Sequence, residues 1–246
     1  AAIAQHRPDL LLVIAFGQKV GPALVALPGR GAINVHASLL PRWRGAAPIN
    51  WAIMAGDPVT GVSIITLADR IDAGPILAQV STPVDPCETA GDLHDRLALL
   101  AAPLLVETLD RIEQGTATYT QQDPAGATLA RKLKKADGFL DLALPAPDLV
   151  RRIRGLWPWP GAMADYVVRG TGRCVRVTLA AAEAVEARPG LAPGTLDDRL
   201  CVTCAPGALK ITAIKPAGSG LMDFRDFVNG RRTLPGDALI QVTTGS

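Results

Sequence analysis

Between residues 9 and 115, apolar runs of strand length alternate with stretches of helical periodicity, and this alternation limits the folds open to the chain. Runs at 10–16, 32–36, 61–67 and 75–81 are typical of strands. The first of them is uninterrupted and predicts a strand buried in a parallel sheet. Strands that alternate with helices predict an α/β unit with a largely parallel sheet.

The clearest helix is predicted from Thr89 to Gly115. Thr89 is followed three residues later by Asp92, a spacing that predicts a capping box with aspartate in place of glutamate. Apolar residues then recur on one helical face, and Gly115 ends the pattern. The stripe consists of Leu93, Leu97, Leu100, Leu104 and Ile112.

The pattern changes after a polar segment at 116–128, which contains proline and glycine and is typical of a linker. A short helix is predicted at 147–156. Short alternating stretches separated by turn residues follow it, as in a small β-barrel. The sequence therefore predicts an α/β domain at 1–118, a linker at 119–132 and a β-rich domain at 133–246.

Charge is divided unequally between these halves. The chain has 25 Lys and Arg against 23 Asp and Glu, a net charge of +2. Residues 1–132 carry a balance of −2 and residues 133–246 a balance of +4, which points to an anionic partner for the second half. No apolar run is long enough to cross a membrane and no secretory signal opens the chain, so we expect a cytoplasmic protein without membrane contact.

Four cysteines are too few and too scattered for a disulfide framework. Cys201 and Cys204 form a CxxC pair, but no second pair or nearby histidine completes a zinc site. We therefore expect structural cysteines and no metal.

Polar side chains gather around the end of the strand at 32–36. Asn34 and His36 lie two residues apart on it and therefore face the same side of the sheet. Asp69 and Asp72 fall in the turn between two later strands, at a sheet end where ligands of open α/β sheets bind. An amide, an imidazole and a carboxylate form a workable set for acyl transfer, because the first two donate to a developing oxyanion and the acid orients the imidazole.

Structural roles explain the same residues equally well from spacing alone. An Asn–His pair in a strand can be a hydrogen-bonded core pair. Asp72 precedes an Ala-Gly turn and suits such a turn by itself. Arg42 and Arg44 can be solvated loop charges.

The run INVHASLLPRWRGAAPINWAI, with IDAGPIL following, closely resembles the methionyl-tRNA formyltransferase family. Its looser part, Asn-x-His followed by Ser-Leu-Leu-Pro, is similar across enzymes that use 10-formyltetrahydrofolate. The segments ARKLKKADGFL, IRGLWPWP and IKPAGSGLMDFRDFVNGRR resemble the C-terminal domain of that family. The resemblance implies a partial Rossmann-like catalytic domain followed by a small OB-like barrel that contacts tRNA.

The resemblance also implies roles for individual residues. Asn34, His36 and Asp72 match the catalytic residues, while Ser38, Leu39, Leu40 and Pro41 match the loop that holds the folate. The formyl group would pass from 10-formyltetrahydrofolate to methionine on initiator tRNA, with no metal, in an enzyme that we expect to be a monomer. The basic residues expected to contact tRNA are Arg42, Lys132, Lys134, Lys135, Arg151, Arg152, Arg154, Arg231 and Arg232.

The resemblance begins inside the catalytic domain. The first strand, the glycine-containing turn and the basic loop with which family members start have no counterpart here, so we expect an N-terminally truncated chain. The strand at 10–16 would then have an exposed apolar edge. Two other functions remain open: formylation of an amino-sugar nucleotide by the same residues, and tRNA binding without catalysis.

Overall fold

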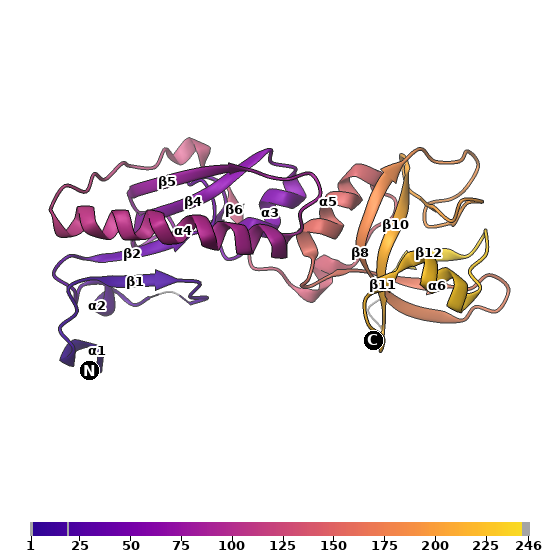
Figure 1. Cartoon of the computed structure of the whole chain (residues 1–246), viewed down its shortest axis with the longest axis horizontal. Helices are drawn as coiled ribbons and strands as arrows, with labels where there is room; N and C mark the ends of the chain where they lie inside the picture. The colour runs from indigo at the N-terminus through magenta and orange to yellow at the C-terminus, as the bar shows by residue number, and fades with distance from the viewer. Residues whose placement is uncertain (1, 19, 243–246) are drawn as a thin grey trace. The chain divides into compact units, whose positions relative to one another are not determined.

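The computed structural model describes residues 2–18 and 20–242, which form two compact units (Figure 1). The first unit consists of residues 1–52 and 57–132, and the second of residues 53–56 and 133–246.

The stretch up to residue 132 begins with short elements and ends with a long helix and a polar segment. In chain order it contains α1 (Ala2–Gln5), β1 (Leu11–Ile14), α2 (Pro22–Val25), β2 (Ala32–His36), β3 (Arg44–Gly45), α3 (Pro48–Ala55), β4 (Val59–Thr66), β5 (Ile76–Pro83), α4 (Ala90–Glu113), the 3-10 turn η1 (Pro124–Gly126) and β6 (Leu129–Ala130).

A four-stranded sheet in the order β1-β2-β4-β5 forms the centre of the first unit. The predicted fold class is confirmed, because an α/β unit with a mixed sheet is followed by a β-rich unit. Within this four-stranded sheet β1 and β2 pair in parallel, whereas β4 is antiparallel to both β2 and β5. The sheet is therefore less parallel than the alternation of strands and helices predicts. Residues 67–75, which join β4 to β5, are too few for the crossover that a parallel pair needs.

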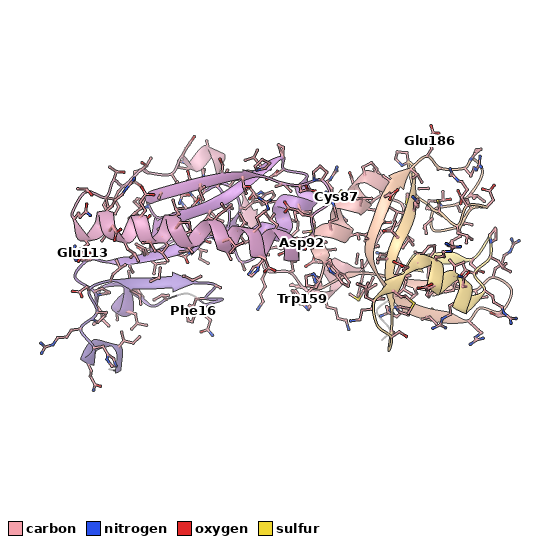
Figure 2. The ribbon with its side chains drawn as sticks, in the orientation of Figure 1. Phe16, Cys87, Asp92, Glu113, Trp159 and Glu186 are labelled. Atoms are coloured by element: carbon pink, nitrogen blue, oxygen red, sulfur yellow. The ribbon has the colours of Figure 1, made fainter. Side chains whose placement is uncertain are left out.

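The expected burial of the first strand is wrong, and the exposed apolar edge is confirmed. β1 is the edge strand, and Leu12 and Ile14 are 38% and 54% exposed. Phe16 extends from the chain just after β1 (Figure 2) and is also exposed. An uninterrupted apolar run predicts burial only where other elements cover both faces of the strand.

The predicted long helix is present as α4, which runs along one face of the sheet (Figure 1). The Thr89 side chain accepts from the Asp92 N–H, and the Asp92 carboxylate accepts from the Thr89 N–H, which confirms the capping box. These hydrogen bonds lower the pKa of Asp92. Asp92 and Glu113 lie near opposite ends of the helix (Figure 2). Its Ile112 joins Ile33, Ile64 and Leu77 in the core.

The segment at 119–132, which the sequence predicts to be a linker, is hydrogen-bonded to the rest of the first unit. Thr120 and Ile76 exchange two backbone hydrogen bonds of 2.8 Å. β6 pairs in parallel with β3, so Leu129 and Ala130 lie opposite Arg44 and Gly45.

The second unit consists mainly of antiparallel strands, and sequence patterns missed its last helix and strand. It contains the 3-10 turn η2 (Lys135–Gly138), α5 (Ala146–Leu156), β7 (Ala162–Val167), β8 (Cys174–Val185), β9 (Val202–Thr203), β10 (Ala208–Pro216), β11 (Met222–Asp223), α6 (Phe224–Arg231) and β12 (Ala238–Gln241).

The strands form a strongly curved sheet in the order β11-β10-β8-β7-β12, and β9 pairs with β10. Isolated bridges join Thr195 to Ala238 and Leu196 to Val202, which nearly closes the sheet into the predicted barrel. Cys201 and Cys204 flank β9 and are buried, and burial raises the pKa of Cys204 to about 11. No helix among residues 2–18 and 20–242 is both long and apolar enough to span a membrane.

A buried polar network ties β7 to the segment before β12. The Tyr166 hydroxyl donates to the Asp237 carboxylate and lies 3.0 Å from the Thr233 hydroxyl. Asp237 Oδ1 also accepts from the Arg169 N–H at 2.8 Å. Burial, followed by the hydrogen bond to Asp237, raises the pKa of Tyr166 to about 12.

This network makes alkaline pH destabilising for the second unit. The phenol of an unfolded tyrosine ionises near the reference value of 10.0. Because the folded state holds its proton more tightly, Tyr166 stabilises the fold below pH 10 and loses that contribution as the pH rises toward 12. We expect phenolate absorbance from Tyr166 only near pH 12, and its disappearance in Tyr166→Phe. Ionisation near pH 10 in the folded protein would contradict the network.

Candidate active site

β2 places two polar side chains on one face of the sheet. Asn34 and His36 both line a cavity of about 590 Å³, whose other lining side chains are mostly apolar. β2 is fixed from both sides, since Val13 of β1 and Ile65 of β4 lie opposite Asn34. The predicted alternation along the strand therefore brings the amide and the imidazole to one cavity.

Asp72 is the third residue at this end of the cavity. It lies in the turn between β4 and β5, with a positive φ of 50° that non-glycine residues seldom adopt. Its Oδ1 accepts from Asn34 Nδ2 at 3.3 Å, and its Oδ2 accepts from the Gly45 N–H at 2.8 Å. His36 Nδ1 lies 3.6 Å from the same Oδ2. Asp69 lies outside the cavity lining.

The hydrogen bonds of His36 decide which ring nitrogen exchanges a proton. Nε2 lies 2.9 Å from the Trp43 carbonyl oxygen, which can only accept, so Nε2 carries a hydrogen. The ring position left to hold a further proton is therefore Nδ1, the nitrogen that faces Asp72. The ring is 5% exposed, which places this proton site beside a carboxylate and away from bulk water.

The turn after Pro41 supplies the carbonyl that holds His36. Trp43 has φ 63°, and its N–H donates to Thr128 Oγ1 at 2.8 Å. Asp57 accepts from the Trp43 indole at 2.6 Å and makes a two-point ion pair with Arg42. Asp57 and Thr128 therefore fix the carbonyl of Trp43 from two directions.

This geometry can perform a specific piece of chemistry. The amide of Asn34 keeps a second hydrogen beyond the one it gives Asp72, and His36 can hold a proton on Nδ1. Both are able to donate to an oxygen that gains negative charge. Asp72 Oδ2 lies close enough to His36 Nδ1 to orient the ring.

The predicted folate loop is hydrogen-bonded, with Ser38 and Leu40 buried and the other two residues half-buried. Ser38 Oγ donates to the Arg42 carbonyl at 2.7 Å, and the Leu40 N–H donates to Ser63 Oγ at 3.0 Å. The residues that line the cavity do not include Ser38, Leu39, Leu40 or Pro41. Their role in holding folate stays a prediction.

The basic residues predicted to contact tRNA differ in their surroundings. Lys132, Lys134, Lys135, Arg231 and Arg232 are exposed, whereas Arg151, Arg152 and Arg154 are half-buried. Arg42 is exposed but pairs with Asp57 at 2.6 Å, and Arg151 pairs with Asp148. Arg231 also lies over the ring of Phe227.

Sequence patterns missed three groups at the site: the Trp43 carbonyl, the Gly45 N–H and the Gln122 amide. Gln122 Nε2 donates to the backbone carbonyls of Asp72 and Gly74, while its Oε1 accepts from Arg44. Two of the three are backbone groups, which no side-chain pattern marks. Among the described residues, no three His, Cys, Asp or Glu side chains form a group that could hold a metal ion.

Comparison with known proteins gives the same family over both units. Residues 1–109 match the family model described as formyl transferase, and residues 132–232 match formyl transferase, C-terminal domain. A relative in Phenylobacterium zucineum named methionyl-tRNA formyltransferase is 44% identical over 222 residues, which cover 90% of this chain and 71% of that protein. One of the same name in a Bradyrhizobium species is 39% identical over 235 residues, which cover 96% of this chain and 75% of that protein.

Solved structures extend the likeness to the fold. HypX from Aquifex aeolicus in complex with tetrahydrofolic acid superposes with a TM-score of 0.67 at 20% identity. The match covers 92% of this chain and 40% of HypX.

The contact between Gly45 and Asp72 depends on a position that only glycine fills without strain. Gly45 has φ +121°, and a Cβ there would lie 2.5 Å from the Ala130 carbonyl oxygen. Gly115 also has a positive φ, of +68°, but a Cβ there meets nothing within 4 Å. We expect Gly115→Ala to lower the free energy of unfolding by about 1 kcal/mol and Gly45→Ala by about 3 kcal/mol. Urea denaturation of both variants measures the difference, and equal losses would show that β3 tolerates the side chain.

Proposed function

The chain belongs to the methionyl-tRNA formyltransferase family, and on that premise we propose that it transfers the formyl group of 10-formyltetrahydrofolate to the α-amino group of methionine on initiator methionyl-tRNA. The observation that carries the proposal is the meeting of Asn34, His36 and Asp72 at the polar end of one cavity. The reaction is a one-carbon transfer that serves translation initiation.

The cavity suits the formyl donor. Its volume of about 590 Å³ lies within the usual range of small-molecule sites. Apolar residues such as Ile65, Leu67 and Leu97 line it beyond the polar side chains, as an aromatic ligand with one reactive group requires. The formyl donor acts as a co-substrate, and we assign no metal to the reaction.

Attack of the methionine amine on the formyl carbon converts the carbonyl oxygen into an oxyanion. We assign stabilisation of this oxyanion to the free amide hydrogen of Asn34 and to the proton on His36 Nδ1. The Asn34 hydrogen is already in place when the charge develops, whereas His36 Nδ1 donates once it has taken up the proton that the attacking amine loses; each donor contributes a rate factor of about 10²–10³.

The proton balance assigns a second task to His36. The attacking amine loses one proton, and the folate nitrogen that leaves the tetrahedral intermediate gains one. Nδ1 takes up the first and delivers the second, since the Trp43 carbonyl already occupies Nε2. Asp72 stabilises the imidazolium that exists between the two transfers.

We assign tRNA binding mainly to the second unit and the segment that leads into it. Lys132, Lys134, Lys135, Arg231 and Arg232 present exposed charges that phosphate groups can approach. Arg42 would first have to share its contact with Asp57. The folate role of Ser38, Leu39, Leu40 and Pro41, the monomeric state and the cytoplasmic location complete the proposal.

Removal of the site residues tests the chemistry. We expect His36→Ala to lower kcat for formylation of charged initiator tRNA by ~10²–10⁴, because both the proton carrier and an oxyanion donor are lost. Asn34→Ala is expected to lower kcat by ~10²–10³. His6→Ala is the control, since His6 is exposed and lies outside the cavity lining. Unchanged kcat in His36→Ala would refute the assignment.

The same assay separates the other functions. Faster formylation of an amino-sugar nucleotide than of charged initiator tRNA would favour the sugar reaction. Binding of tRNA by a wild-type protein that formylates neither substrate would favour a binding protein without catalysis.

The salt dependence of tRNA binding tests the assigned lysines. We expect Lys134→Ala and Lys135→Ala each to weaken binding and to reduce the slope of log Kd against log salt by about one, if each contacts one phosphate. Lys210→Ala is the matched control, because Lys210 already pairs with Glu183 at 3.0 Å. Equal slopes in all three variants would place the tRNA elsewhere.

A further inference from the structure

We propose that Gln122 is a positioning residue, which holds Asp72 in the backbone conformation that the reaction uses. The inference rests on the proposed function, because it concerns a residue that we assign to the chemistry. Gln122 belongs to the polar segment at 119–132 and is 8% exposed.

The amide nitrogen of Gln122 is bonded at two points of the turn between β4 and β5. Nε2 donates to the Asp72 carbonyl oxygen at 2.8 Å and to the Gly74 carbonyl oxygen at 2.7 Å. The two hydrogens of a single amide group therefore hold two carbonyls, two residues apart, near the β5 end of the turn.

Arg44 fixes the orientation of this amide. Its Nε and Nη2 donate to Gln122 Oε1 at 3.0 and 2.7 Å. Because a guanidinium group only donates hydrogen bonds, the amide oxygen must face Arg44 and the NH₂ group must face the turn. A rotation of the amide by half a turn would place two donors against Arg44 and an oxygen against two carbonyls.

The turn needs this support because its backbone is strained. Asp72 adopts φ 50° without the freedom of glycine, and such residues persist only where the surroundings over-determine them. Two residues on, a Cβ at Gly74 would lie 1.9 Å from the Thr66 carbonyl oxygen. A side chain therefore does not fit at this position, where the turn lies against the end of β4.

A change of backbone at Asp72 would move its carboxylate. The carboxylate now accepts from Asn34 at 3.3 Å and from Gly45 at 2.8 Å, and lies 3.6 Å from His36 Nδ1. β3 supports this arrangement twice, since Gly45 contacts the carboxylate directly and Arg44 acts on the backbone through Gln122. Loss of the Gln122 amide should therefore disturb the chemistry more than substrate binding.

Gln122→Met tests the inference, because methionine has a similar length and shape but neither donates nor accepts in the same way. In the purified protein we expect kcat to fall at least tenfold, while KM for charged tRNA and for the formyl donor changes less than twofold. Gln121→Met is the matched control, since Gln121 is the exposed neighbour. A folded Gln122→Met variant with kcat within twofold of wild type, or with altered KM alone, overturns the inference.

Gln122→Glu decides the matter if Gln122→Met fails to fold. Glutamate keeps acceptors for Arg44 but replaces the NH₂ group with an oxygen that faces two carbonyls. A tenfold or larger loss of kcat in this folded variant supports positioning of Asp72, whereas wild-type kcat shows that only the contact with Arg44 matters and overturns the inference.

Hydrogen exchange separates this inference from the proposed function. The Gly45 amide hydrogen is bound to Asp72 Oδ2, so its exchange should accelerate at least tenfold in Gln122→Met and remain unchanged in Gln121→Met. Unaltered exchange overturns the positioning role whatever the enzyme does. If the wild-type protein does not formylate but exchange is faster in the variant, the proposed function is overturned. The role of Gln122 in positioning Asp72 then stands.

Discussion

The carboxylate of Asp72 joins groups that lie far apart in the sequence. It accepts from a side chain of β2 and from the backbone of β3, while its own residue occupies a turn that follows β4. A left-handed backbone at a non-glycine residue is unfavourable and must be held by its surroundings. Gln122, fifty residues later in the chain, supplies this support, because its buried amide donates to two carbonyls of the turn. The geometry around His36 depends on this closure, because the ring is otherwise fixed through Nε2 alone.

Local signals predicted much of the fold. The capping box of α4 needs only Thr89 and Asp92, three residues apart, and β2 has the predicted bounds. Non-local pairing was harder to predict. An apolar run does not reveal whether another element covers it, so β1 was expected to be buried, whereas half-buried and exposed residues alternate along it. The last helix and strand of the second unit escaped notice because polar and turn residues interrupt the short apolar stretches between Phe224 and Gln241.

The groups of the site likewise fall into those that sequence patterns indicate and those that they do not. The period of a strand brings Asn34 and His36 to one face, and the end of a strand marks Asp72, so residue patterns indicate all three. The groups that hold them are invisible to such patterns. The Trp43 carbonyl and the Gly45 N–H belong to the backbone, which every residue shares, and Gln122 stands in a segment whose composition is typical of a loop. Family resemblance indicated the residues that we assign to the reaction but none of these supports, because contacts made through the backbone leave little trace in a motif.

β12 has a consequence for the order in which the protein acquires its structure during synthesis. Its residues pair with β7, more than seventy positions earlier, and Asp237 beside it receives the hydrogen bond of Tyr166. The sheet of the second unit is therefore incomplete until residue 241 has left the ribosome. All partners of Asp72, in contrast, have been made by residue 122. The residues that we assign to the chemistry can thus assemble while the ribosome is still adding the barrel, and the hydrogen bonds of Asp72 can form before the second unit closes.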